Sequence, residues 1–535
     1  MSNQVSPQKD RYVHDLLPAT DHMPEFLPIA GVAMSGELNC VEHLLDQNLK
    51  EGRRDKTAFI NDQQSWTYGQ LADRVNQIAA RLVHEFDVQP GNRVLIRGAN
   101  SPHVAAIWLA IQKVGAVGVT SMSLLRSAEL QVILEISLPV VIFCEGALKD
   151  ELYDAVAKGN IQADVVVFDE REDGLFGGVA GDIIPVENCK TLADDISIIA
   201  FTSGTTGKPK ATVHFHRDIM AICHTVCRHM LQADGDDIFI GTAPLAFTFG
   251  LGGLLVFPLF CGAAAILKGR YNPAGFVDTI ARHQATICFT VPTYYQQILK
   301  LDGSDRLASL RLAVSSGEAL PLPVRSSWSL KTGIEMVELL GSTEMLHAFI
   351  GARGDAIRPG FIGPAIAGYK AAILDGDGQI LLAGEIGRLA VQGPTGCRYL
   401  NDDRQKNYVE NGWNITGDAC VMTEDGYIAY HTRYDDMIIT AGYNVSGLEV
   451  ENAILDHPKV NECAVIGVSD DDRGQIVAAF IVPAKGVCAG PQLGLELKDY
   501  VKSRIAPYKY PRKIVFLDQL PRNESGKIQR FRLIE

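Results

Sequence analysis

Short apolar runs rich in β-branched residues alternate with helical patterns through roughly the first four hundred residues of this chain. Residues 67–86 place their apolar side chains on one helical stripe, and strand-like runs occur at 93–97, 140–143, 165–168 and 196–201. Strands and helices that alternate in this way pack as sheets covered by helices, because each element buries one face against the next. The sequence therefore predicts a large N-terminal α/β domain of layered sheets and helices.

The pattern changes near residue 434, where a second and smaller unit begins. Two apolar runs flank a polar loop as in a hairpin, and a helical segment and one more strand follow, at residues 463–468, 476–482, 495–505 and 513–517. About a hundred residues suit a small α+β domain. We expect a large domain over residues 1–434 and a small C-terminal domain over residues 435–535, with the boundary in the charged segment 433–436.

Charge and hydropathy narrow the function classes. The chain of 535 residues has 49 Lys and Arg against 63 Asp and Glu, a net charge of −14, which argues against nucleic acid or an anionic membrane as the main partner. Four glycines and Pro258 interrupt the most hydrophobic segment, 249–267, which favours a buried helix and strand over a membrane span. A polar start and eleven scattered cysteines without a CxxC pair predict a cytoplasmic protein in a reducing compartment. Cys223 and Cys227 are expected to pack in a core.

One loop has the composition of a polyphosphate site. The strand-like run 196–201 leads into Thr-Ser-Gly-Thr-Thr-Gly-Lys-Pro-Lys, residues 202–210, in which six of nine residues are Gly, Ser or Thr and two are Lys. Glycines let backbone amides approach an anion, hydroxyl groups add donors, and lysines add charge. The spacing differs from the Walker loop. A surface turn is the ordinary alternative for a loop of this composition.

The loop resembles the signature of the adenylate-forming superfamily, which contains acyl- and aryl-CoA ligases, adenylation domains of peptide synthetases, and luciferases. Further matches follow in the family's order: Gly-Ser-Thr-Glu at 341–344, Gly-Trp-Asn-Ile-Thr-Gly-Asp at 412–418, and the segments 433–442 and 521–530. The resemblance implies a large α/β domain with a small mobile C-terminal domain. It also implies that ATP, Mg²⁺ and coenzyme A are used to activate a carboxylic acid through an acyl-adenylate.

Activation of a carboxylate needs a good leaving group and neutralisation of the developing charge. By the resemblance, Thr343 contacts the α-phosphate, and Glu344 holds Mg²⁺, for which a hard carboxylate oxygen is suited. Taken alone, Glu344 would be a solvated or capping acid. The residues expected to hold the β- and γ-phosphates are Thr202, Ser203, Gly204, Thr205, Thr206, Gly207, Lys208 and Lys210.

The resemblance also assigns the nucleoside contacts. Asp418 would accept hydrogen bonds from both ribose hydroxyls, because a carboxylate offers two acceptor oxygens. Arg433 would contact the ribose or a phosphate. The alternatives are a turn residue and a surface charge. The adenine would be flanked by Gly317, Glu318, Ala319 and Leu340, the last standing where many relatives have Tyr.

The C-terminal motifs would serve two half-reactions. In the family, the lysine that matches Lys527 enters the site from the small domain and bridges the carboxylate and the α-phosphate. Asp435 matches the hinge position, and Gly442 matches the glycine that lets pantetheine pass close to the backbone. Without the resemblance, Lys527 would be an exposed lysine near the C-terminus.

The identity of the acid depends on a shorter motif. The Met-Leu-His that ends at His347 resembles benzoate– and 2-aminobenzoate–CoA ligases, in which this His reaches the substrate carboxylate. A packed or capping histidine is the alternative. The pocket wall is expected to comprise Phe247, Thr248, Phe249, Gly341, His347 and Ala348. Small Ala348 and the hydroxyl of Thr248 favour a substituted benzoate, with 2-aminobenzoate first, over benzoate itself.

The same motifs are compatible with other functions. A medium-chain fatty acyl-CoA synthetase, a stand-alone adenylation enzyme that loads a carrier protein, and an oxidative luciferase would share these motifs. His214 and His216 would face the same way on a strand, but no set of zinc ligands is completed around them, and a zinc site is not expected there. We therefore expect a small aromatic acid and CoA as partners, no nucleic acid or membrane partner, and a monomer or homodimer.

Overall fold

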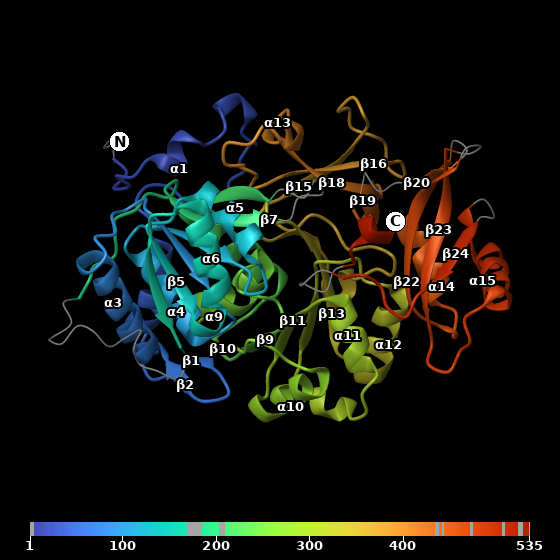
Figure 1. Ribbon diagram of the computed structural model, residues 1–535, viewed down its shortest axis with the longest axis horizontal. Coiled ribbons are helices and arrows are strands. Elements are labelled where there is room, and N and C mark those ends of the chain that lie inside the picture. Colours follow the sequence, from blue (N-terminus) through green and yellow to red (C-terminus); the bar gives the residue numbers. More distant parts are fainter. Residues whose placement is uncertain are drawn as a thin grey trace.

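The computed structural model describes residues 5–169, 185–202, 209–433, 438–440, 443–470, 474–505, 509–522 and 528–533. Four sheets are present within these residues. Figure 1 shows three of them, with their helices, in one large body, whereas the C-terminal elements form a smaller body on the side away from α3 (Tyr68–His84). The predicted α/β class with a smaller C-terminal domain is confirmed.

Two mostly parallel sheets form the base of the large body. One has the order β6-β5-β3-β4-β7-β8, and only its β7–β8 pair is antiparallel. Its strands are β3 (Arg93–Arg97), β4 (Val117–Ser121), β5 (Val141–Glu145), β6 (Asp164–Phe168), β7 (Ile196–Thr202) and β8 (Lys210–Phe215). The four strand-like runs read from the sequence fall in β3, β5, β6 and β7. Burial on both faces explains the nearly continuous apolar runs of β3, β5 and β7, whereas β6 is an edge strand and is only partly buried.

The second sheet has the order β14-β13-β12-β11-β9-β10-β1-β2. Its strands are β1 (Thr57–Ile60), β2 (Ser65–Thr67), β9 (Ile238–Gly241), β10 (Ala264–Ile266), β11 (Ile287–Thr290), β12 (Leu312–Ser315), β13 (Glu335–Gly341) and β14 (Ala348–Gly351). The six central strands β13, β12, β11, β9, β10 and β1 run parallel to one another. The edge strands β2 and β14 pair antiparallel with their neighbours. The turn between β13 and β14 holds residues 342–347, which include the predicted metal and acid contacts.

Helices cover both sheets. They are α1 (Tyr12–Asp15), α2 (Gln47–Lys50), α3, α4 (Pro102–Lys113), α5 (Ser127–Ser137), α6 (Lys149–Gly159), α7 (His216–Ile222), α8 (Thr248–Leu251), α9 (Phe257–Cys261), α10 (Pro273–His283), α11 (Pro292–Leu299) and α12 (Leu322–Thr332). The short helix α13 (Gln405–Tyr408) packs on the third sheet. Helix α3 begins with a capping box, in which Thr67 and Gln70 each accept from the other's backbone N–H. Its apolar stripe is buried, which confirms the helix expected over 67–86.

The hydrophobic segment 249–267 is a helix followed by a strand, as predicted. Helices α8 and α9 are joined by a π-helical stretch, Gly252–Val256, and β10 follows. Cys223 and Cys227 lie in another π-helical stretch, Cys223–Met230, and both are buried in the main core as expected. Among the described residues, no helix is both long and apolar enough to cross a bilayer.

An antiparallel third sheet links the two bodies. It consists of β15 (Lys370–Leu374), β16 (Ile386–Gln392), β17 (Val409–Glu410), β18 (Trp413–Met422) and β19 (Ile428–Arg433). In Figure 1 it lies above the two larger sheets. It ends at Arg433, and the next described strand belongs to the C-terminal sheet. This change of sheet supports the domain boundary that we propose near residue 434.

The C-terminal sheet contains the predicted hairpin. Its strands are β20 (Ile438–Thr440), β21 (Tyr443–Val445), β22 (Val460–Asp470), β23 (Gly474–Pro483) and β24 (Lys513–Phe516), and its helices are α14 (Gly447–Leu455) and α15 (Pro491–Arg504). Strands β22 and β23 pair antiparallel, with Ile466 opposite Ala478. The helix expected from 495 starts earlier, because Pro491 suits the first turn of a helix.

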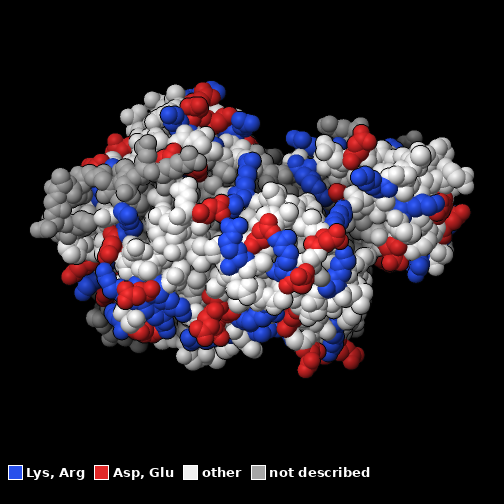
Figure 2. All heavy atoms as spheres, turned by 90° about the horizontal axis from the view of Figure 1, so that it is seen from below, with Lys and Arg blue, Asp and Glu red and all other residues white. Residues whose placement is uncertain are grey.

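Acidic and basic side chains are interspersed over the face of the molecule shown in Figure 2.

Candidate active site

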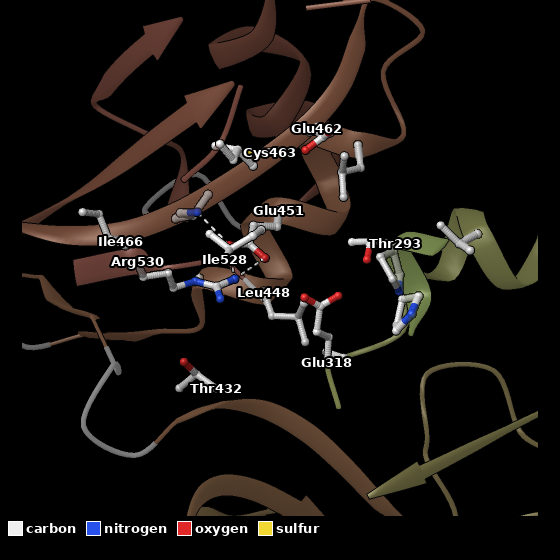
Figure 3. A pocket seen from close by; sticks show the side chains of 18 of the residues that line it. Thr293, Glu318, Thr432, Leu448, Glu451, Glu462, Cys463, Ile466, Ile528 and Arg530 are labelled. Atoms are coloured by element: carbon white, nitrogen blue, oxygen red, sulfur yellow. Dashed lines mark hydrogen bonds and ion pairs between the residues drawn. The ribbon is translucent and has the colours of Figure 1, made fainter. Parts of the chain in front are cut away.

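A cleft of about 520 Å³ lies between the large body and the C-terminal sheet. From the large body it is lined by the predicted adenine segment, Gly317, Glu318 and Ala319, and by Arg433. Figure 3 shows Glu318 on one side of the cleft, with Glu451 and Arg530 on the other. The structure thus brings the predicted nucleoside contacts to the junction of the two bodies.

Ion pairs line the C-terminal side of the cleft, and one of their members, Arg522, reaches the large body. The Arg530 guanidinium donates to both oxygens of Glu451, at 2.7 and 2.9 Å, and Arg522 donates to Glu462 at 2.8 Å. Arg522 also lies 3.9 Å from the Glu318 carboxylate of the large body. These ion pairs were not predicted from the sequence, because their members are separated by 60 or more residues and belong to no single motif.

The predicted ribose contacts are neighbours on two paired strands. Asp418 of β18 lies opposite Arg433 of β19, and Arg433 Nη1 donates to Asp418 Oδ1 at 2.8 Å. The same nitrogen donates to the Thr416 carbonyl at 3.0 Å. Asp418 is therefore a strand residue and not the turn residue of the alternative reading. The hydrogen bond from the Arg433 guanidinium orients the Asp418 carboxylate.

The turn after β13 carries Thr343 and Glu344. A Cβ added at Gly341 would come within 2.6 Å of the His347 carbonyl oxygen, so this tight turn requires glycine. The Thr343 carbonyl oxygen lies 2.8 Å from His214 Nε2 of β8. The Glu344 carboxylate accepts a hydrogen bond from the Tyr399 hydroxyl at 2.5 Å. Lys210 Nζ lies 3.3 Å from the same hydroxyl, so the structure brings the predicted phosphate and metal residues together.

His347 is enclosed by aromatic rings, and neither ring nitrogen has a well-formed hydrogen bond, although the nearby Phe249 backbone partly opposes the effect of burial on its pKa. Its ring lies 4.8 Å from that of Phe257 and 5.8 Å from that of Phe249. A Cβ at Gly252 would approach His347 Cδ2 to 2.5 Å, so glycine is needed beside it. Burial lowers the pKa of His347 to about 3, and the histidine is therefore neutral at pH 7. A buried polar group of this kind needs a partner, and a ligand can supply one.

The other predicted pocket residues lie on the same two segments. Thr248 starts α8 and is buried, Phe247 is the residue before that helix, and Ala348 starts β14 with almost no exposure. Leu340 is half-buried and pairs with Ile350 across β13 and β14. The packing of Phe249 on His347 links the two segments directly.

Several predicted residues lie outside the described part of the chain. Thr202 and Lys210 are paired across the ends of β7 and β8. Residues 203–208, which join these two strands, lie outside the described residues. Ile528, next to Lys527 in the sequence, lines the cleft. The roles proposed for Ser203, Gly204, Thr205, Thr206, Gly207, Lys208, Asp435, Gly442 and Lys527 remain predictions.

The two bodies also match two family models. A model described as "AMP-binding enzyme" matches residues 45–398, and one described as "AMP-binding enzyme C-terminal domain" matches residues 449–527. The chain belongs to the AMP-binding enzyme family. The superfamily inferred from the sequence is therefore confirmed.

Curated relatives within the AMP-binding enzyme family include two ligases of aromatic acids. The benzoate–CoA ligase of Thauera aromatica is 36% identical, over 92% of this chain and 95% of that protein. The 4-hydroxybenzoate–CoA/benzoate–CoA ligase of Rhodopseudomonas palustris is 33% identical, over 93% of this chain and 94% of the relative.

Solved structures of AMP-binding enzymes agree with the fold. An anthranilate CoA ligase in complex with anthranoyl-AMP has a TM-score of 0.87 and 31% identity, over 93% of this chain and 96% of the other. A benzoate CoA ligase from Burkholderia xenovorans LB400 has a TM-score of 0.86 and 31% identity, over 93% of this chain and all of the other. The likeness extends over both bodies.

Proposed function

We propose that this AMP-binding enzyme is an ATP-dependent aryl-CoA ligase. In the first half-reaction, an oxygen of the aromatic carboxylate attacks the α-phosphorus of ATP, and pyrophosphate leaves. In the second, the thiol of CoA attacks the acyl carbon, AMP leaves, and the thiol proton is released. The observation that carries the proposal is the buried, neutral His347 between the rings of Phe249 and Phe257, three residues from Glu344. The aromatic acid ligases among the relatives support it.

His347 suits recognition of a carboxylate attached to a ring. A neutral imidazole keeps one N–H to donate and does not trap the carboxylate in a strong ion pair. Phe249 and Phe257 offer ring faces and edges against which an aryl group can pack. The acid would be held by its carboxylate at one end and by apolar contact along the ring.

The phosphate end of the site fits a hard cation. Glu344 offers carboxylate oxygens beside the Lys210 ammonium, and together with the phosphates of ATP it would hold Mg²⁺, which supplies neutralising positive charge. Lys210 adds a fixed charge for the β- and γ-phosphates. Asp418, oriented by Arg433, would accept from the ribose hydroxyls. In this arrangement Thr343, which precedes Glu344 in the same turn, would contact the α-phosphate.

Among aromatic acids, the proposal favours 2-aminobenzoate. Ala348, next to His347, has a small side chain, and the buried Thr248 hydroxyl can pair with a ring substituent. A paired polar group can discriminate strongly between substrates, because an analogue that lacks the partner leaves the site unsatisfied. Phe249, which follows Thr248, contacts the His347 ring and supports this placement.

A substrate panel tests the proposal. The purified chain, with MgATP and CoA, is given 2-aminobenzoate, benzoate, 4-hydroxybenzoate and octanoate, and kcat/KM is measured by AMP release. We expect 2-aminobenzoate to exceed benzoate, and both to exceed octanoate by at least about tenfold. Preference for octanoate over every benzoate would instead make the chain a fatty acyl-CoA synthetase.

A further inference from the structure

We propose that Tyr399 is a positioning residue. Its hydroxyl group fixes the Glu344 carboxylate and the Lys210 ammonium at the positions from which they would hold the phosphate end of ATP. Tyr399 belongs to none of the sequence motifs. The proposal rests on the proposed function, because it assigns Glu344 to the metal and Lys210 to the phosphates. It adds a residue that acts through Glu344 and does not touch the reacting atoms.

The backbone on either side of Tyr399 is hydrogen-bonded to β8, the strand that begins with Lys210. The Val213 N–H donates to the Arg398 carbonyl at 2.8 Å, and the Leu400 N–H donates to the Ala211 carbonyl at 2.9 Å. Tyr399 itself lies opposite Thr212 in this pairing. The segment that carries Tyr399 therefore moves with β8, and the position of its ring relative to Lys210 is fixed.

The Tyr399 hydroxyl bridges a cation and an anion. It donates to Glu344 Oε1 at 2.5 Å, and Lys210 Nζ lies 3.3 Å from the hydroxyl oxygen. The Lys210 ammonium also lies 5.0 Å from the centre of the Tyr399 ring. One hydroxyl thus contacts both groups that the proposed function assigns to the phosphate end of ATP.

The ring cannot turn freely, because it is packed and its backbone is held. Tyr399 is 1% exposed, and its ring meets that of Tyr408 edge-on, with centroids 5.6 Å apart. The Tyr399 N–H donates to Gln405 Oε1 at 2.8 Å. A glutamate side chain has many rotamers, and a fixed donor on one oxygen selects among them. The hydrogen bond leaves Glu344 Oε2 to face a cation, which suits the strict geometry of Mg²⁺.

Tyr399→Phe tests the proposal, and Tyr408→Phe is the matched control. Both variants keep the paired rings, but the Tyr408 hydroxyl faces Ser342 Oγ at 3.4 Å and not Glu344. Mn²⁺ serves as the probe, and its binding in the presence of a non-hydrolysable ATP analogue is followed by the loss of the free-ion EPR signal. We expect Tyr399→Phe to weaken Mn²⁺ binding by about 10- to 100-fold, the usual effect of losing a partner of a metal ligand. The KM for the acid should not change.

A double substitution separates action through Glu344 from a general packing role. If Tyr399 acts through that carboxylate, Tyr399→Phe should have no further effect on Mn²⁺ binding once Glu344→Gln is present. Equal Mn²⁺ affinity in wild type and Tyr399→Phe would overturn the proposal, as would an equal loss in Tyr408→Phe. Thermal unfolding of each variant checks that the fold is kept.

Failure of this inference can be told from failure of the proposed function. If wild type forms aryl-CoA while Tyr399→Phe binds Mn²⁺ as tightly as wild type does, only the role of Tyr399 is lost. If wild type forms no aryl-CoA but Tyr399→Phe still weakens Mn²⁺ binding, the positioning role stands and the proposed substrate class falls.

Discussion

Replacement of Lys527 by Ala is expected to slow formation of the acyl-adenylate by about 10²- to 10³-fold, the usual loss for one donor to a transition state. Conversion of a preformed acyl-adenylate to the thioester should change much less. The reason is that the proposed contact, between the ammonium and the charge that develops on the carboxylate and α-phosphate, exists only in the first half-reaction. The neighbouring Ile528 lines the cleft, which supports this assignment.

The two half-reactions can be measured separately. Adenylation is followed by exchange of labelled pyrophosphate into ATP, and thioester formation by adding CoA to synthetic aryl-adenylate. Lys513→Ala, at the exposed start of β24, serves as the control in the same domain and should leave both rates unchanged. If Lys527→Ala slowed both half-reactions equally, the proposed role of this lysine would be wrong.

Replacement of Asp218 by Asn is expected to lower the free energy of unfolding by about 3–5 kcal/mol, the range found when one member of a buried ion pair is removed. Asp218 Oδ2 lies 2.7 Å from Arg398 Nη1, and both side chains are fully buried. Arg398 lies between the rings of Phe26 and Phe215. Asn would leave that guanidinium charged and without its counterion.

The effect of Asp218 should depend on pH. Burial alone would raise the pKa of Asp218, but attraction to Arg398 and the contact with His214 hold it well below its usual range. A carboxyl group with a lowered pKa in the folded state stabilises the protein above its unfolded pKa, about 3.9, and loses this contribution as the pH falls further. The difference between wild type and Asp218→Asn should therefore be constant near neutral pH and shrink below about pH 4.

Urea unfolding at pH 7 measures this loss. Asp154→Asn, in the exposed pair with Lys158, is the matched control and should have no measurable effect. The double variant Asp218→Leu and Arg398→Met should be less destabilised than Asp218→Asn, because no charge is left without a partner. A single variant as stable as wild type would show that the buried pair contributes nothing.

Much of the fold could be predicted, because it is encoded in local patterns. Helix α3 has both its apolar stripe and its capping pair within twenty residues of sequence, and the β22–β23 hairpin encloses its own polar loop. The order of the strands in the sheets could not be predicted. β1, for example, pairs with β10, about two hundred residues away, and only tertiary packing brings them together.

The candidate-site residues that could be named from the sequence are those that belong to continuous motifs. Thr343, Glu344 and His347 share one turn, Asp418 ends the motif 412–418, and Arg433 begins the motif 433–442. Tyr399 was missed, because its contact with Glu344 spans 55 residues and its contact with Lys210 spans 189. Nothing in the sequence around Tyr399 marks it, since its role follows from the pairing of its segment with β8.

The central claim is that one site joins an aromatic acid to AMP and then transfers it to a thiol. Mass spectrometry of the purified chain with MgATP and 2-aminobenzoate, first without CoA and then after its addition, tests this directly. The account predicts an enzyme-bound 2-aminobenzoyl-adenylate with release of pyrophosphate, followed by equal amounts of AMP and 2-aminobenzoyl-CoA. Formation of ADP and phosphate, or no adenylate with any aromatic acid, would contradict it.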